Sequence, residues 1–198
     1  LLEPYGGEIL GLSVGSTTSL TGAWAIGALL AFAFSGRRLS GGSDPLRLAG
    51  LGAVAGIGAF LMTLFAAPLQ SVPLLYAGAT VIGFGTGLFS VGTMIAAMGL
   101  AQKDSAGLAL GAWGAVQASC AGLGVALGGL LRDGMAYIAL QKGMGATLAD
   151  RATGYGTVYA LEVLLLLVTL VVLGPVIGLH LEKQNKTNEN FGLSEFPT

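Results

Sequence analysis

Three polar side chains lie in, or at the end of, long apolar stretches of this chain, where an unpaired polar group is costly. Gln117 is near the middle of one stretch, and Glu162 is about one and a half turns inside another. His180 stands at the end of that second stretch. An unpaired ionised group in hydrocarbon costs several kcal/mol, so each of these side chains needs a partner or a function.

For Glu162 and Gln117, a structural and a functional interpretation both stay open. Glu162 is either a protonated or hydrogen-bonded glutamate near the interface, with Tyr155 or Tyr159 as its candidate partner, or it is a proton or cation site. Gln117 either forms a hydrogen bond between helices or offers an oxygen ligand to a bound cofactor. Both residues are therefore candidate cofactor-binding residues.

His180 is the third candidate, as the only imidazole in the sequence. A neutral imidazole is a good axial ligand for the magnesium of a chlorin. The residue also stands beside Glu182 and Lys183, which favours a position among lipid head groups. Any other magnesium would have to be held by glutamine, a backbone carbonyl or water.

The sequence contains no recognisable catalytic set. It has one histidine, no acid pair within an apolar stretch, and no phosphate loop followed by Lys-Ser or Lys-Thr. Its one cysteine, Cys120, forms no disulfide within the chain and no cysteine metal cluster. We therefore expect a protein that is not an enzyme.

The elements that must position these side chains are five apolar stretches, at about residues 9–34, 48–65, 72–100, 106–131 and 157–179. Each is near or above the ~20 residues that a helix needs to cross the hydrocarbon core. The composition agrees, because 54% of the residues are hydrophobic and 10% are charged. The sequence predicts an all-α integral membrane bundle over residues 1–181, followed by a polar tail, 182–198.

The basic residues give this bundle a direction. One side carries six of the nine, in the first and third breaks and in the tail, and the other side carries Arg132, Lys142 and Arg151. By the positive-inside bias the C-terminal tail is cytoplasmic and the N-terminus is not. The chain begins with Leu at this outer end, so we expect a further helix before residue 1. A net charge of −1 argues against a nucleic-acid partner. Contact with lipid head groups is enough to explain the basic residues in the loops.

Three irregular segments are expected. Residues 132–153 form a loop outside the cytoplasm, with an interfacial helix near 135–148. The tail has no helical periodicity and is expected to be disordered unless a partner orders it. The third stretch is longer than the bilayer is thick, and Gly83, Gly85 and Gly87 mark its weakest point.

The sequence contains 34 glycines, and many of them have four-residue spacing. Such pairs place a bare strip on one helix face, which either packs inside the bundle or faces a partner helix or a pigment ring. Trp24 and Trp113, inside the spans, would fill gaps beside glycine. The pairs are Gly52/Gly56, Gly83/Gly87, Gly107/Gly111, Gly124/Gly128 and Gly174/Gly178.

Three blocks of sequence resemble a known family. Residues 1–15 read LLEPYGGEILGLSVG, residues 111–118 read GAWGAVQA and residues 128–133 read GGLLRD. They are similar to the PucC/LhaA group, the so-called bacteriochlorophyll delivery proteins of the major facilitator superfamily in purple phototrophic bacteria. The resemblance covers about residues 1–180, and the basic loop at 36–38 also resembles the loop that recurs in facilitators.

The resemblance implies that the chain is the last five helices of a twelve-helix facilitator fold. It also implies a role in assembling the reaction-centre and light-harvesting complex of the intracytoplasmic photosynthetic membrane. Antenna polypeptides and the reaction centre would be the partners, and bacteriochlorophyll or carotenoid the bound pigment. Five helices alone would not transport, because transport needs two halves.

Two other interpretations remain open. The chain could be the C-terminal half of a facilitator secondary transporter, for which a continuous upstream reading frame with seven more spans would be evidence. It could also be a pigment-binding protein that acts alone, which predicts bound chlorin in the purified chain.

Overall fold

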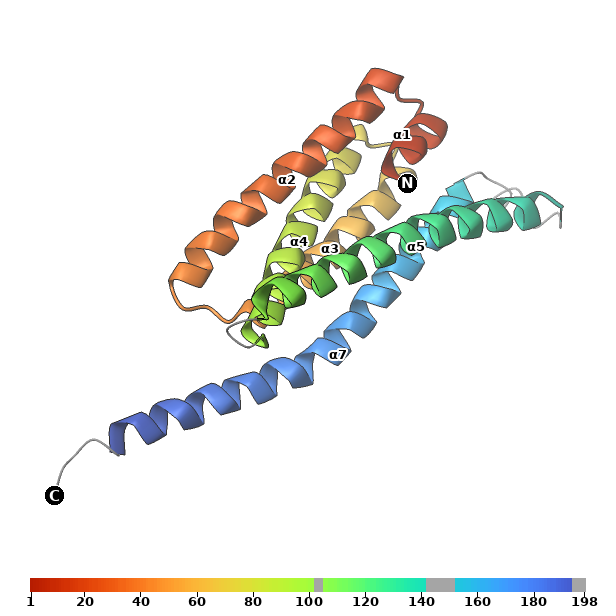
Figure 1. Ribbon diagram of the computed structural model, residues 1–198. Coiled ribbons are helices and arrows are strands. Elements are labelled where there is room, and N and C mark those ends of the chain that lie inside the picture. The colour runs from red at the N-terminus through yellow and green to blue at the C-terminus, as the bar shows by residue number, and fades with distance from the viewer. Residues whose placement is uncertain (102–104, 142–151, 194–198) are drawn as a thin grey trace.

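The computed structural model describes residues 1–101, 105–141 and 152–193. Side chains are described up to residue 138 in the second range and up to residue 178 in the third. The described backbone is almost entirely helical and contains no strand (Figure 1). The helices are α1 (Leu2–Leu10), α2 (Val14–Ser40), α3 (Pro45–Ala66), α4 (Val72–Gly99), α5 (Ala106–Gln141) and α7 (Ala152–Leu193).

Five segments in the described residues are long and apolar enough to cross a membrane. They are α2, α3, α4, the part of α5 from Ala106 to Ile138, and the part of α7 from Ala152 to Gly178. The all-α prediction with five spans is confirmed. The arrangement of a facilitator half stays a prediction.

The start of the first predicted span, at residue 9, is wrong. Residues 2–10 form a separate short helix, α1, which ends at Gly11 with a φ of 66°. Glycine adopts this left-handed conformation without a steric penalty, so it ends the helix. The side chain of Ser13 then accepts a hydrogen bond of 3.3 Å from the Ser16 amide and caps the start of α2.

The predicted loop and interfacial helix after residue 131 are wrong for residues 132–141, which continue α5. The charges expected to end the span are paired instead. Arg132 lies 2.6 Å from Asp133 and donates a 2.8 Å hydrogen bond to the hydroxyl of Tyr155. Residues 142–151, including Lys142, Asp150 and Arg151, lie outside the described residues.

The irregular tail predicted from residue 182 is wrong for residues 182–193, where α7 continues as a helix. The sequence 179–191 has no glycine or proline, which permits this. It also has Glu182 four residues before Lys186, a spacing and order that favour a helix. Residues 194–198 lie outside the described part of the chain.

Helices α2, α3 and α4 form the tightly packed part of the molecule. The backbones of α2 and α4 are in direct contact where the two helices cross. A Cβ added at Gly83 would overlap the carbonyl of Trp24, and a Cβ added at Gly27 would overlap the carbonyl of Thr80. On the other side of α4, a Cβ at Gly52 would lie 2.6 Å from the Gly85 carbonyl oxygen. Glycine is thus required at both crossings.

The weak point expected within α4 is not found. The helix is unbroken from Val72 to Gly99, and Gly83, Gly85 and Gly87 are all buried. A Cβ at Gly87 would lie 2.6 Å from that of Ala31 in α2. These glycines therefore hold α4 between its two neighbours.

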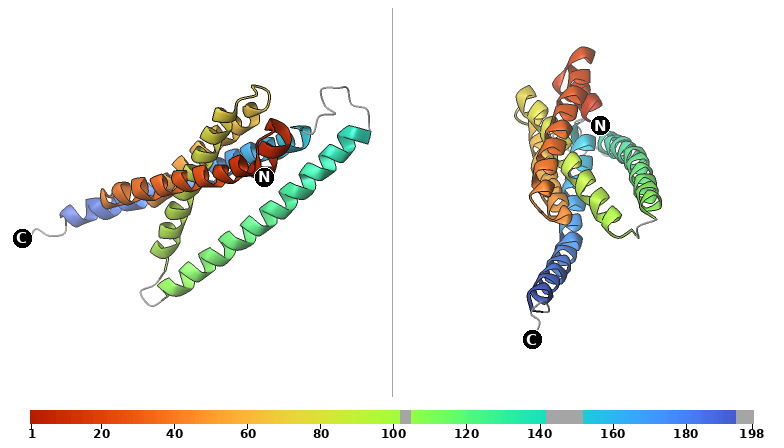
Figure 2. Two further views of the ribbon diagram at one scale, coloured as in Figure 1. Left: turned by 90° about the horizontal axis from the view of Figure 1, so that it is seen from above. Right: turned by 60° about the vertical axis from the view of Figure 1, so that its left-hand side comes forward.

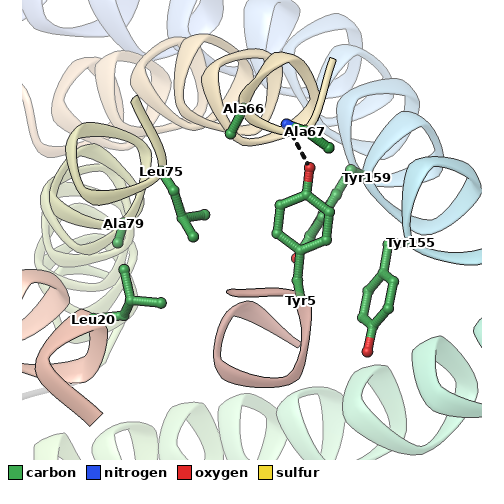
Figure 3. Packing of buried hydrophobic residues seen from close by; sticks show 8 residues of the cluster. All are labelled: Tyr5, Leu20, Ala66, Ala67, Leu75, Ala79, Tyr155 and Tyr159. Carbon is green, nitrogen blue, oxygen red and sulfur yellow. Dashed lines mark hydrogen bonds between the residues drawn. The ribbon is translucent and has the colours of Figure 1, made fainter. Parts of the chain in front are cut away.

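A cluster of tyrosines joins α1 and α7 to the end of α3 (Figure 3). The ring of Tyr5 lies 5.3 Å from that of Tyr155 and 5.2 Å from that of Tyr159, centre to centre. All three residues are at least 97% buried, with exposures of 2%, 1% and 3%. Aromatic packing therefore attaches the short helix α1 to the bundle.

The hydroxyl of Tyr5 is inserted into the last turn of α3. It donates to the carbonyl of Thr63 at 3.0 Å and accepts from the amide of Ala67 at 3.2 Å, two groups four residues apart. Such a pair would bond directly in a continuing helix. Burial raises the pKa of the Tyr5 hydroxyl, so it keeps the proton that it donates.

We expect Tyr5→Phe to lower the free energy of unfolding by about 1–3 kcal/mol, because Phe keeps the ring contacts but leaves two buried backbone groups without the hydroxyl. Denaturant unfolding in detergent micelles measures this. Tyr5→Ala removes both ring and hydroxyl and should cost more. Equal stability of Tyr5→Phe and wild type would show that the inserted hydroxyl has no net effect.

Candidate helix-docking cleft

Helix α5 stands apart from the rest of the bundle. Among residues 106–138, none is buried, whereas α2, α3 and α4 each contribute buried residues. Figure 2 (left) shows α5 separated from the other helices over much of its length. This helix is therefore held by a few local contacts.

One contact lies in the first third of α5 and is polar. The indole of Trp113 donates to the Thr93 hydroxyl at 3.1 Å, and the amide of Gln117 donates to the Ser90 hydroxyl at 2.9 Å. Both acceptors belong to α4. Gln117 thus forms the interhelical hydrogen bond that one of its two interpretations predicted.

The second contact lies near the other end of α5 and involves Arg132. Its guanidinium donates to the Tyr155 hydroxyl of α7 and lies 5.2 Å from the centre of that ring. It also pairs with Asp133 at 2.6 Å and with Glu8 of α1 at 3.8 Å. Arg132 therefore ties α5 to both α7 and α1.

Close contact between α5 and α7 is limited to this end. A Cβ at Gly154 would lie 2.6 Å from the carbonyl oxygen of Arg132, and one at Gly128 would lie 3.8 Å from Val158. From the first pair to the second, the residue number falls by four in α5, from 132 to 128, and rises by four in α7, from 154 to 158. This is the pattern expected of two antiparallel helices that face each other.

A further four residues along each helix, Gly124 of α5 is level with Glu162 of α7, and here the two helices have separated. A Cβ at Gly124 would meet nothing within 4 Å. The space between α5 and α7 is therefore a wedge that is narrow at Gly128 and Val158 and opens beyond Glu162. We call it the α5–α7 cleft.

The α5–α7 cleft has a volume of about 610 Å³ and walls from several helices. Its α5 wall consists of Val125 and four small residues, Cys120, Ala121, Gly124 and Gly128. Its other walls are mostly apolar, and they contain one carboxylate. The remaining lining residues are Leu1, Leu2, Trp24, Phe60, Ile82, Thr86, Val158, Tyr159, Glu162 and Leu165.

Glu162 lies deeper than the sequence suggested. It follows Ala152, the first residue of α7, by ten positions, which places it roughly 15 Å along the helix axis. The predicted hydrogen bond to a neighbouring tyrosine is wrong. The hydroxyl of Tyr155 bonds to Arg132, and that of Tyr159 is buried with no hydrogen-bond partner among the described residues.

The glycine pairs divide between the two predicted roles. Gly52, Gly56, Gly83 and Gly87 pack inside the bundle, with Gly56 against Leu166 of α7. A Cβ would meet nothing within 4 Å at Gly107, Gly111, Gly124, Gly174 and Gly178. Gly124 lines the α5–α7 cleft, and the other four glycines are outside its lining, so uncovered glycine strips occur on both α5 and α7.

The remaining predicted residues have different outcomes. Trp24 lines the α5–α7 cleft, and Gln117 does not. His180 belongs to the α7 backbone, but its side chain lies outside the described side chains. Sequence reasoning missed Arg132 as the link between α5 and α7; its position beside Asp133 at the end of an apolar stretch was the available signal.

Within the described side chains, no three His, Cys, Asp or Glu residues gather to hold a metal ion. Of the predicted ligand residues, Glu162 lines the cleft and Gln117 does not. Pigment binding stays a prediction.

The fold and the cleft define a multi-pass membrane protein whose most distinctive feature is a wedge between two helices. Its sequence matches the profile of the PUCC protein family over residues 1–180. The chain belongs to the PucC family.

Individual relatives agree with this. The chain is 46% identical over its whole length to an uncharacterized protein in the puhA-bchM intergenic region of Rhodobacter capsulatus. It is 55% identical to Protein PucC of Rhodovulum sulfidophilum over 67% of the chain, and 44% identical to Protein PucC of Cereibacter sphaeroides over 89%.

The chain is shorter than these relatives. It spans 42%, 29% and 38% of their respective lengths. No solved structure matches the chain.

Proposed function

We propose that this chain is a membrane scaffold for assembling a photosynthetic reaction-centre and light-harvesting complex, and that it does not transport by itself. Its partners would be single-span antenna polypeptides, which dock as helices in the α5–α7 cleft, together with the reaction centre. Membership of the PucC family supports the assembly role. The cleft is the observation on which the docking role rests.

The chemistry of the α5 wall favours a helix as the occupant. Cys120, Gly124 and Gly128 recur every four residues, so their small side chains form one strip along α5. Such strips let two helix backbones approach closely and gain van der Waals contact, which is the main attraction between helices in lipid. A flexible lipid chain gains less from a rigid strip.

The proposed orientation follows the basic residues. The N-terminus would face the periplasm and the C-terminus the cytoplasm of the photosynthetic inner membrane. The cleft would then open along the bilayer, where a single-span polypeptide can enter sideways.

A second candidate function is the C-terminal half of a secondary transporter of the facilitator type. The greater length of the relatives favours it, since more than half of each has no counterpart here. A continuous upstream reading frame with further spans, together with substrate uptake by the long protein, would be the evidence for it.

Cys120 provides a direct test of docking, because it is the one cysteine in the sequence and it is exposed in the cleft. A photo-crosslinker attached to Cys120, activated in photosynthetic membranes, is expected to capture an antenna polypeptide. Mass spectrometry of the crosslinked band identifies it. The matched control is Cys120→Ala with Leu123→Cys, which moves the probe to a residue of α5 that does not line the cleft.

We expect at least about a tenfold higher yield from Cys120 than from Leu123→Cys, a difference that corresponds to about 1.4 kcal/mol in local occupancy. Equal yields from the two positions, or capture of lipid alone, would contradict docking in the cleft.

A further inference from the structure

A second cavity lies where α2 ends and α3 begins, at the opposite end of α2 from α1 (Figure 1). It has a volume of about 450 Å³, and its described lining residues all lie between Arg38 and Leu51. One continuous segment therefore builds this cavity, at a point separated from α1 by the 27 residues of α2. We call it the α2–α3 pocket.

The turn between the two helices brings two arginines to this pocket. The backbone reverses at Gly42, which has a φ of 80°, and the amide of Ser43 donates to the carbonyl of Arg38 at 3.1 Å. Asp44 then begins α3, because its carboxylate accepts hydrogen bonds of 2.8 and 3.2 Å from two amides of the first turn. Arg38, near the end of α2, and Arg47, in the first turn of α3, thus line one pocket.

The charges in the α2–α3 pocket favour an anion. The guanidinium of Arg38 lies 5.0 Å from the centre of the Phe34 ring, which holds it against α2. Among the described side chains, neither Arg38 nor Arg47 forms an ion pair. Asp44 also lines the pocket, but it is only 6% exposed and its carboxylate is engaged by helix amides. Two positive charges therefore face one carboxylate that is already hydrogen-bonded.

Phosphate is the anion whose chemistry fits this arrangement. A planar guanidinium donates two parallel hydrogen bonds to phosphate oxygens, so two guanidiniums that line the same pocket can hold one phosphate group between them. The hydroxyl of Ser43, which also belongs to the pocket, is a further donor. The donors come from both helices and from the turn that joins them.

A membrane lipid is the source of phosphate that the surroundings favour. Helices α2 and α3 are both long and apolar enough to cross a membrane, so the turn between them lies at the level of the head groups. Toward the middle of α3 the pocket is lined by Leu48 and Leu51, and Leu51 is 52% exposed. A phosphate held by the arginines would thus have its acyl chains beside an apolar wall.

We propose that Arg38 and Arg47 bind the phosphate group of an anionic membrane lipid in the α2–α3 pocket. The bound lipid links the end of α2 to the start of α3 at the membrane surface. This site is separate from docking in the α5–α7 cleft, so either proposal can fail without the other.

Native mass spectrometry of the full chain, titrated in detergent with phosphatidylglycerol, measures the binding. We expect Arg38→Gln and Arg47→Gln each to weaken the affinity about tenfold, because each removes charge-assisted hydrogen bonds to the phosphate. The matched control is Arg37→Gln, which removes the same charge from a neighbouring exposed residue that does not line the pocket. It is expected to change the affinity by less than about twofold, because an exposed charge outside the site is screened.

Equal weakening by Arg37→Gln and Arg38→Gln would show only a general attraction to the basic surface and would overturn the site. Two further ligands identify the source of the phosphate. Phosphatidylcholine, whose head group is zwitterionic, is expected to bind more weakly than phosphatidylglycerol, and equal binding would overturn the preference for an anionic lipid. Inorganic phosphate at the concentration of the lipid is expected to leave the lipid bound, and displacement of the lipid would overturn its assignment as the ligand.

Discussion

Replacing Gly83 with leucine is expected to prevent α4 from packing against α2. Even the first carbon of a new side chain would overlap the carbonyl of Trp24. Helix α4 cannot move aside without opening its crossing with α3 at Gly52 and Gly85, and α2 cannot move aside without losing its close contact with α4 at Gly27. Overpacking of a close contact costs about 3 kcal/mol. We expect most of the Gly83→Leu protein to be lost to unfolding or degradation.

The yield of monodisperse protein in detergent and the denaturant midpoint measure this effect. Gly111→Leu is the matched control, because it makes the same replacement in a membrane helix where a Cβ meets nothing within 4 Å. It should fold at least as well as wild type, since leucine has the higher helix propensity. Normal yield and stability of Gly83→Leu would contradict the backbone contact between α2 and α4.

The second large effect is expected from Arg132→Met, which removes the polar link between α5 and α7. The change leaves the Tyr155 hydroxyl without its donor and removes the cation–π contact and the pair with Glu8. Together these contacts contribute about 2–4 kcal/mol to holding the end of α5. We expect α5 to separate from α7 while α2, α3 and α4 stay packed.

Hydrogen–deuterium exchange in lipid nanodiscs distinguishes these two parts of the chain. Faster exchange is expected in peptides from 106–138 of Arg132→Met, with little change in peptides from α3 and α4. Arg37→Met removes an exposed arginine at the end of α2 and serves as the control. Uniformly faster exchange along the whole chain would show that Arg132 stabilises the entire fold rather than α5.

Much of the helical organisation is predictable from apolar length alone, because a membrane helix must satisfy its own backbone. Errors occur where a single residue or a distant partner decides the boundary. Gly11 ends α1 by a left-handed turn inside an apolar stretch, which length cannot reveal. Arg132 looked like the end of a span, but α5 continues through it, and its charge is paired with Asp133 and Glu8 and hydrogen-bonded to Tyr155, 23 residues away.

The candidate site was less predictable than the fold. Gln117 and Glu162 stand out in the sequence because they are polar among apolar residues, and both interpretations of each could be written down. The sequence cannot tell which glycine strips are covered, since Gly83 and Gly124 have similar surroundings along the chain. Gly83 is covered because the backbones of α2 and α4 are in contact there. Gly124 is uncovered because α5 diverges from α7.

The Tyr5 hydroxyl also bears on the order in which the protein matures. The last turn of α3 depends on a group that is synthesised about sixty residues earlier and must find it again after α2 has crossed the bilayer. The turn that follows holds Gln70 in a left-handed conformation, with a φ of 47°. We therefore expect the α3–α4 hairpin to reach its final geometry only after α1 has docked against it.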